Sequence, residues 1–258
     1  MLAFITGTGF YTLPGLTDTD QRTVPTPFGD VTVTRGLLAG EEVAFIPRHG
    51  ADHSVPPHRI NYRANIAALS EIGAGAIIAT AVSGSLHREV GPGSLRLVDQ
   101  FIDLTWGRPL TFFDHEVRHT DMTHPYHQGL RGALLEAAQA AGVEILPTAT
   151  YVCFNGPRFE TPAEIRMAAT MGGDLVGMTG CPEVVLANEL GIPYASIGVV
   201  SNLCAGMEDQ PLSVEEIMAI LENTAEPLQR LIGAALPALV AVAADSKVSM
   251  VQTKEDRR

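Results

Sequence analysis

Four short segments of the chain are apolar on both faces, and this property constrains the fold most strongly. They cover residues 2–6, 42–47, 76–82 and 193–200. A strand whose alternate side chains all avoid water needs cover on both sides, as in the central sheet of an α/β protein. Helical patterns accompany these strands at residues 62–72, 125–141, 163–171, 182–190 and 213–231. The alternation predicts an α/β sandwich.

Length and composition indicate one domain. The chain has 258 residues, of which 46% are hydrophobic, so it can bury a full core. We place the domain at residues 1–244. After an Ala/Val-rich stretch the sequence turns polar and charged, and residues 245–258 are predicted to form a flexible tail.

The net charge of -12 restricts the partners. Nucleic-acid binding depends on many Lys and Arg contacts to phosphates, so it is not expected, whereas small anions remain possible. No basic segment precedes the first apolar strand, and the apolar run at 231–244 is interrupted by Gly233 and Pro237. The three cysteines show no CxxC pairing. We therefore expect a cytoplasmic protein without a membrane partner.

Cations gather in one segment, residues 48–65. It carries Arg48, His49, His53, His58, Arg59 and Arg63 against a single acid, Asp52. Guanidinium and imidazole donors match phosphate oxygens, so the segment favours a small anionic ligand. A solvated basic loop is the alternative.

Two turns of small residues follow predicted strands. Gly7-Thr8-Gly9 comes after the first strand and Val82-Ser83-Gly84-Ser85 after the third. Open α/β sheets bind ligands at this edge, and such turns expose N–H groups to anions. Plain tight turns are equally compatible with the first run. A nucleophilic serine is disfavoured because Ser83-Gly84-Ser85 lacks the GxSxG pattern.

Two further segments carry polar or reactive groups. Residues 113–127 contain Asp114, His115, His119, Asp121, His124 and His127, but their spacing matches no metal-binding motif, so we predict no metal. Residues 153–161 combine Cys153, Phe159 and Glu160. Phe159 could stack on a base while Glu160 accepts from ring N–H groups, although a structural turn would look similar. Cys153 has no identifiable basic partner, which disfavours a cysteine nucleophile.

Taken together, these segments resemble the family of trimeric purine nucleoside phosphorylases and methylthioadenosine phosphorylases, from residue 5 to about residue 231. The matching runs are Gly7-Thr8-Gly9, Thr26-Pro27-Phe28-Gly29, Arg48-His49-Gly50 with His53, Asn61-Tyr62-Arg63-Ala64-Asn65, Asp99-Gln100-Phe101-Ile102-Asp103, Gly156-Pro157-Arg158-Phe159-Glu160-Thr161, and Gly177-Met178-Thr179 followed by Pro182-Glu183. The resemblance implies a three-layer sandwich with a central mixed, twisted β-sheet flanked by helices.

The reaction implied by the resemblance is phosphorolysis of a purine nucleoside, with inorganic phosphate as cosubstrate and no metal or organic cofactor. By position, Met178 would lie under the sugar, and Asn202 and His49 would be catalytic. The phosphate would be held by Thr8, Arg48, His49, the backbone at Val82, and Thr179.

Two residues bear on the choice of base. Asn202 stands where relatives selective for 6-oxopurines resemble one another in having Asn, and those for 6-aminopurines have Asp. An Asn amide can donate to O6 and accept from a protonated N7. Glu160 is similar to the Glu that accepts from N1–H in the oxopurine enzymes. The implied base is a 6-oxopurine, since an unpaired polar group in a buried site rejects the wrong ligand.

The 5′ end of the substrate depends on Val214. Enzymes for ordinary nucleosides are similar to one another in having a His there. Val214 with Ile217 would instead bury a 5′-methylthio group. His119 matches a residue that relatives contribute to the neighbouring subunit's 5′ pocket, which implies a homotrimer with shared sites.

The resemblance therefore implies a phosphorylase for S-methyl-5′-thioinosine. Run 202–206 lacks a second Asp typical of methylthioadenosine enzymes, and Ala81 replaces a phosphate-binding Thr of some relatives. Three alternatives stay open: methylthioadenosine phosphorolysis, inosine or guanosine phosphorolysis, and a noncatalytic purine-binding protein.

Overall fold

A computed structural model describes residues 1–50, 52–208 and 213–255, with side chains to residue 246. Within these residues one 10-stranded mixed sheet runs in the order β2-β3-β4-β1-β5-β9-β8-β7, and β10 pairs with β5 and β6. The strands are β1 (Leu2–Thr6), β2 (Leu16–Val24), β3 (Val31–Leu38), β4 (Glu41–Pro47), β5 (Ala76–Ser85), β6 (Leu95–Leu97), β7 (Gln100–Asp103), β8 (Thr150–Cys153), β9 (Leu175–Gly177) and β10 (Tyr194–Leu203). Strand β1 lies parallel to β4 and β5, and β10 lies parallel to β5.

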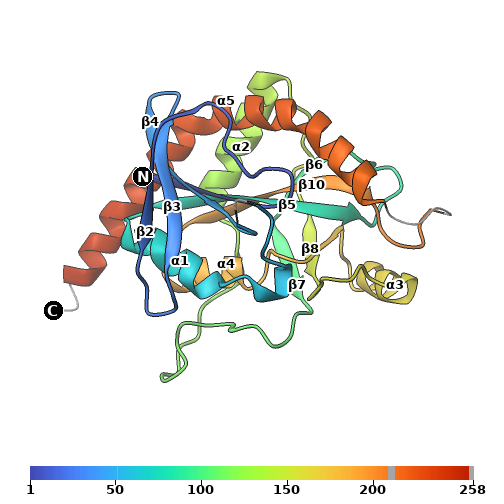
Figure 1. Ribbon diagram of the computed structural model, residues 1–258, viewed down its shortest axis with the longest axis horizontal. Helices are drawn as coiled ribbons and strands as arrows, with labels where there is room; N and C mark the ends of the chain where they lie inside the picture. The colour runs from blue at the N-terminus through green and yellow to red at the C-terminus, as the bar shows by residue number, and fades with distance from the viewer. Residues whose placement is uncertain (51, 209–212, 256–258) are drawn as a thin grey trace.

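Helices cover both faces of this sheet, as the sandwich prediction requires. They are α1 (Tyr62–Glu71), α2 (Gln128–Ala141), α3 (Pro162–Thr170), α4 (Glu183–Glu189) and α5 (Val214–Glu255), with a short 3₁₀ turn, η1, at Pro57–Arg59. Helices α2 and α5 lie on one side and α1 and α4 on the other, while α3 stands beside β8 (Figure 1). The three-layer sandwich is therefore confirmed.

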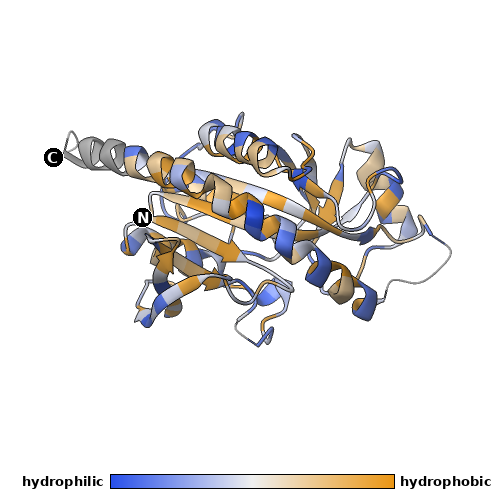
Figure 2. Cartoon of the chain, turned by 90° about the horizontal axis from the view of Figure 1, so that it is seen from above, coloured by the Kyte–Doolittle hydropathy of each residue, from blue (hydrophilic) through white to orange (hydrophobic). Residues whose placement is uncertain are grey.

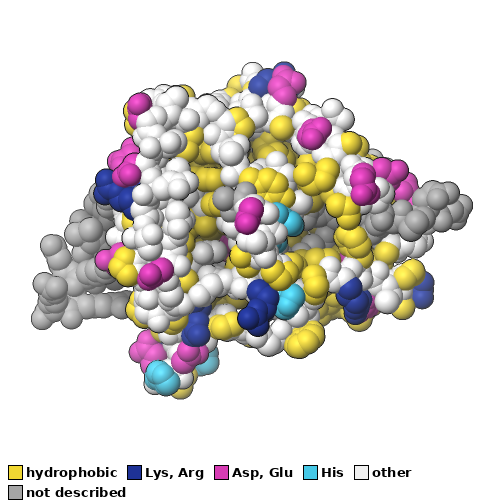
Figure 3. All heavy atoms as spheres, viewed as in Figure 1, with side chains coloured by type: hydrophobic (Ala, Val, Ile, Leu, Met, Phe, Trp, Pro, Cys, Tyr) yellow, Lys and Arg dark blue, Asp and Glu magenta, His cyan; other side chains and the backbone are white. Residues whose placement is uncertain are grey.

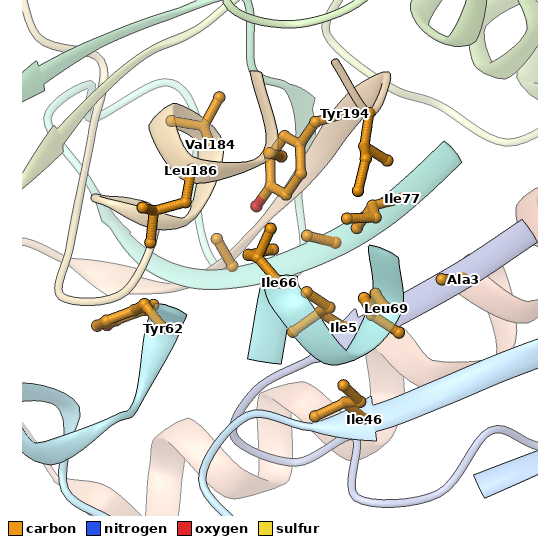
Figure 4. Packing of buried hydrophobic residues seen from close by; sticks show 14 of the residues in the cluster. Ala3, Ile5, Ile46, Tyr62, Ile66, Leu69, Ile77, Val184, Leu186 and Tyr194 are labelled. Carbon is orange, nitrogen blue, oxygen red and sulfur yellow. The ribbon is translucent and has the colours of Figure 1, made fainter. Parts of the chain in front are cut away.

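Strand β1 shows why its apolar pattern is continuous. Leu2 and Phe4 belong to the core under α2 and α5, whereas Ala3 and Ile5 belong to the core under α1 and α4. Figure 4 shows the second core, where Ile5 lies close to Ile66 and Leu69 of α1. Because alternate side chains enter two cores, no position on the strand can be polar without cost.

Helix α5 is longer than predicted. It starts one residue after Ser213, whose hydroxyl accepts from the Glu216 amide at 3.3 Å, and it contains Pro227 and Pro237. The helix runs on to Glu255, so most of the segment predicted as a flexible tail is helical; residues 256–258 lie outside the described residues.

One face of α5 is buried. By length and composition, the range Val214–Ser246 could cross a membrane. Leu231 and Leu239, however, are fully buried in the core beneath the helix. Seen from above, α5 lies along the apolar strands and carries hydrophilic residues on its outer side (Figure 2).

Candidate active site

A cavity of about 400 Å³ opens where β1, β5, β9 and β10 end. It brings together ten of the twelve residues that the sequence suggested for the site: Thr8, His49, Val82, Phe159, Glu160, Met178, Thr179, Asn202, Val214 and Ile217. Hydrophobic and histidine side chains gather near the centre of the face shown in Figure 3. Arg48 and His119 are not among the lining residues.

His49 lies at one end of the cavity with Gly7 and Thr8. It is nearly fully buried, and its Nδ1 lies 2.8 Å from the carbonyl oxygen of Val55. Burial lowers the pKa of His49 to about 4, and the charge of Arg48 acts in the same direction. The imidazole is therefore neutral at neutral pH.

Arg48 lies directly behind this end of the cavity. A Cβ on Gly7 would stand 3.0 Å from its Nη1, so the glycine separates the guanidinium from the cavity by backbone alone. Nε and Nη2 each donate to a different oxygen of Glu183 at 2.7 Å, and Nη1 donates to the Thr80 carbonyl at 3.1 Å. Nη1 carries two N–H groups, and the bond to Thr80 uses one of them. The other can donate to an anion.

Glu183 is the partner that the sequence did not predict. Its side chain is fully buried and also accepts from the hydroxyl of Tyr194 at 2.7 Å. Burial alone would lower the pKa of Arg48, but the charge and hydrogen bonds of Glu183 raise it. Glu183 thus keeps Arg48 charged inside the protein. The run Pro182-Glu183 is visible in the sequence, yet nothing local pairs it with a residue 135 positions away.

Thr179 follows β9 in a loop held from below by Tyr151. The Thr179 amide donates to the Tyr151 hydroxyl at 3.2 Å. A Cβ on Gly177 would lie 2.2 Å from that hydroxyl oxygen, so only glycine lets the loop approach the ring. The loop therefore presents Met178 and Thr179 to the cavity from a fixed base.

Asn202 lies in the cavity wall at the end of β10. Its Nδ2 donates to the Leu203 carbonyl at 2.8 Å, and its Oδ1 accepts from the Ser201 hydroxyl at 2.7 Å. The carbonyl partner fixes which end of the amide is nitrogen. One N–H and one lone pair remain for a ligand.

Glu160 enters the same cavity from the turn after β8. Its Oε1 is buried and has no hydrogen-bond partner. Burial raises the pKa of the Glu160 carboxyl, and burial also raises the pKa of neighbouring Cys204 to about 12, with the charge of Glu160 adding to the effect. A buried carboxylate oxygen without a donor is costly, so the site is built for a ligand that brings one.

The three residues predicted at the 5′ end differ in their exposure to solvent. Ile217 is buried, whereas Val214 is 58% exposed at the cavity rim. His119 is exposed on the connection between β7 and α2, outside this cavity.

The alternative chemistries gain no support from the geometry. Ser83 donates to the Ala81 carbonyl at 3.0 Å. Burial raises the pKa of Cys181 well above its usual value, which opposes thiolate formation, and Cys153 Sγ accepts from the amide of Cys181 at 3.4 Å. Among the described residues, no group of three or more His, Cys, Asp or Glu side chains could hold a metal ion.

Comparison with known proteins decides the family. Residues 2–237 match the model of the Phosphorylase superfamily. The chain belongs to this superfamily. A 6-oxopurine nucleoside phosphorylase of Pyrococcus furiosus is 46% identical over 244 residues, covering 92% of each chain. A probable S-methyl-5′-thioinosine phosphorylase of Methanothermobacter thermautotrophicus is 45% identical over 240 residues, covering 92% of this chain and 83% of that protein.

A solved structure supports the same membership. Methylthioadenosine phosphorylase from Schistosoma mansoni in complex with adenine aligns with a TM-score of 0.89 at 30% identity, over 98% of this chain and 97% of that one. The family resemblance seen in the sequence motifs is thereby confirmed, together with its fold.

Proposed function

We propose that the protein catalyses phosphorolysis of a 6-oxopurine nucleoside, S-methyl-5′-thioinosine, to hypoxanthine and 5-methylthioribose 1-phosphate. The observation that carries the choice of base is the buried, unpartnered Oε1 of Glu160 in the cavity that also holds Asn202. Relatives named for 6-oxopurine nucleosides and for methylthioinosine support the same class.

The base follows from hydrogen-bonding capacity. A 6-oxopurine carries a hydrogen on N1, which Glu160 can accept, whereas N1 of a 6-aminopurine has only a lone pair and would face the carboxylate unfavourably. Asn202 offers its free N–H to O6 and its free lone pair to a protonated N7. Both residues thus fit an oxopurine, Glu160 at N1 and Asn202 at O6 and N7.

The reaction requires phosphate beside the sugar. A phosphate oxygen forms the bond to C1′ while the C1′–N9 bond breaks. The electron pair of the broken bond passes to the departing purine, whose N7 takes up a proton from solvent to give hypoxanthine. Thr8, His49, Thr179, the Val82 backbone and the charge of Arg48 would hold the phosphate. Asn202 would stabilise the negative charge that develops on the base. No metal or organic cofactor enters these steps.

The 5′ group follows from Val214 and Ile217. Both are apolar and both line the cavity, so burying a methylthio group there contributes more binding free energy than burying a hydroxyl. The active form would be a homotrimer in which His119 reaches a neighbouring 5′ pocket. Trp106 and Val117 of the same connection are 75% and 90% exposed, as expected of a segment that meets another subunit. We place the enzyme in the cytoplasm, without a nucleic-acid or membrane partner.

The test is base release from methylthioinosine, methylthioadenosine, inosine and adenosine, each with and without phosphate. Phosphate-dependent release led by methylthioinosine is expected. A lead for methylthioadenosine, the substrate class in the names of the structural neighbours, would overturn the roles of Glu160 and Asn202. A lead for inosine would overturn the role of Val214, and binding without release would indicate a noncatalytic purine-binding protein.

A further inference from the structure

Arg108 lies behind the cavity and has an acceptor for every one of its N–H hydrogens. It belongs to the connection between β7 and α2 and is only 7% exposed. Nε donates to Asn155 Oδ1 at 3.2 Å, and Nη2 donates to the carbonyls of Asn155 and Met178 at 2.9 and 2.8 Å. Nη1 donates to the Cys181 carbonyl and, at 3.1 Å, to the Tyr62 hydroxyl. A guanidinium offers five N–H groups, so no donor is spare.

These acceptors lie in or next to three segments of the cavity wall, and Met178 is the one that lines the cavity itself. Asn155 precedes the turn that carries Phe159 and Glu160, and Met178 and Cys181 enclose Thr179. The Tyr62 hydroxyl in turn donates at 3.4 Å to the carbonyl of Pro57, which lies in a third segment of the wall. One side chain therefore joins the wall that would hold the base to the wall that would hold sugar and phosphate.

Close packing between two of these walls makes the link consequential. A Cβ on Gly156, whose φ is +63°, would lie 2.6 Å from the sulfur of Met178. The turn and the loop thus touch directly. Arg108 donates to a main-chain carbonyl in each, at Asn155 next to the turn and at Met178 in the loop. A change in its length would move the two walls relative to one another.

Within the part of the chain that the structure describes, Arg108 also differs from Arg48 in having no carboxylate partner for its positive charge. Glu183 pairs with Arg48 through two hydrogen bonds, but none of the ion pairs among the described residues includes Arg108. Of the groups that the structure describes, only neutral ones offset it: carbonyl oxygens, the Tyr62 hydroxyl, and the Tyr62 ring, whose centroid lies 5.3 Å from the guanidinium carbon. A buried cation is costly without a carboxylate, so its position behind the loop of Met178 and Thr179 favours an anion on the other side.

We propose that Arg108 is a positioning residue for the reaction: it fixes the base-binding turn against the phosphate-binding loop and sets a positive charge behind that loop. The inference rests on the proposed function. It requires no contact between Arg108 and substrate, and Arg108 is not among the residues that line the cavity.

The experiment compares Arg108→Lys and Arg108→Met with the wild type in phosphate-dependent base release from the nucleoside that the wild type uses best. Misplacement of reacting groups by about 1 Å costs roughly 100-fold, so we expect kcat/KM to fall about 100-fold in Arg108→Met, with higher KM values for both phosphate and nucleoside. Arg108→Lys keeps the charge but loses bonds, and a smaller loss with a partly restored KM for phosphate is expected.

The control is Arg131, a buried arginine of α2 that donates to Gln128 and Pro147 away from the cavity. Arg131→Met measures the effect of losing a buried guanidinium on folding alone, which lowers apparent kcat through the folded fraction and leaves both KM values unchanged. The same behaviour in folded Arg108 variants would overturn the proposal. Where Arg108→Met does not fold, Arg108→Lys decides. Where neither folds, Asn155→Ala decides: it removes the oxygen that accepts from Arg108 Nε at 3.2 Å and from the Trp106 amide at 3.4 Å. Absence of turnover in the wild type would instead count against the proposed function.

Discussion

Nδ1 of His49 donates a hydrogen bond of 2.8 Å to the carbonyl oxygen of Val55. A carbonyl can only accept, so Nδ1 carries the hydrogen, and Nε2 of the neutral ring keeps a lone pair. A Cβ on Gly7 would lie 4.0 Å from Nε2, which places this atom at the proposed phosphate end. His49 is thereby suited to accept a hydrogen bond from a protonated phosphate oxygen.

The lowered pKa of His49 predicts a loss of stability in acid. In the unfolded chain His takes a proton near pH 6.5, whereas in the folded protein it does so only near pH 4. The free energy of unfolding should therefore fall between pH 6.5 and pH 4, by up to about 3 kcal/mol from this group, and level off below. Denaturant titrations should show a shallower fall in His49→Asn. His58→Asn, at an exposed side chain, should follow the wild type, and identical pH slopes in all three proteins would contradict the assignment.

Asn202→Asp should shift substrate preference toward 6-aminopurines. The change replaces the free amide N–H with a carboxylate oxygen, which suits a 6-amino donor and repels O6. The ratio of kcat/KM for methylthioadenosine to that for methylthioinosine should rise at least tenfold. An unchanged ratio would remove Asn202 from base recognition.

Glu160→Gln should weaken discrimination from the other side of the base. The amide is a poorer acceptor for N1–H than a carboxylate, so kcat/KM for methylthioinosine should fall about tenfold. Because burial raises the pKa of Glu160, the wild-type KM for methylthioinosine should rise as acid protonates this carboxyl, while the variant lacks that response. A pH profile of KM that is the same in both proteins would show that Glu160 does not face the base.

The parts of the fold that the sequence predicted are those with a strong local pattern. Strands β1 and β5 are buried at nearly every position and mostly apolar, and α3 is capped by Thr161 with a capping box to Glu164. Strand β2 was not predicted because its side chains are mostly exposed, and β9 has only three residues. These strands form because they pair with neighbouring strands, and their own sequences show no periodic pattern that would predict them.

The site divides in the same way. Thr8 and Val82, at the ends of two predicted strands, could be found because parallel strands end at one edge, whereas Asn202 was found through the family resemblance. The supporting residues could not. Glu183, Tyr151 and Arg108 act through partners far along the chain, and only the folded arrangement joins them.

Glu183→Gln should destabilise the protein strongly. It would leave Arg48 charged, buried and without its carboxylate, which typically costs about 3–5 kcal/mol. Chemical denaturation should detect a change of this size, accompanied by a higher KM for phosphate. The matched control is Glu164→Gln, which breaks the more exposed pair with Arg158 and should cost about 1 kcal/mol or less. Equal effects of the two changes would contradict the burial argument.

Val214→His should change the preference at the 5′ end of the substrate. Val214 sits at the cavity rim near buried Ile217, so a longer, polar side chain can be accommodated there and can bond a 5′-hydroxyl. The ratio of kcat/KM for inosine to that for methylthioinosine should rise by about 10-fold or more, because one apolar contact is lost and one hydrogen bond is gained. Val214→Leu is the control: it keeps the site apolar and should leave the preference for methylthioinosine in place. If His and Leu at this position gave the same ratio, the selectivity for the 5′ group would have to come from another part of the cavity.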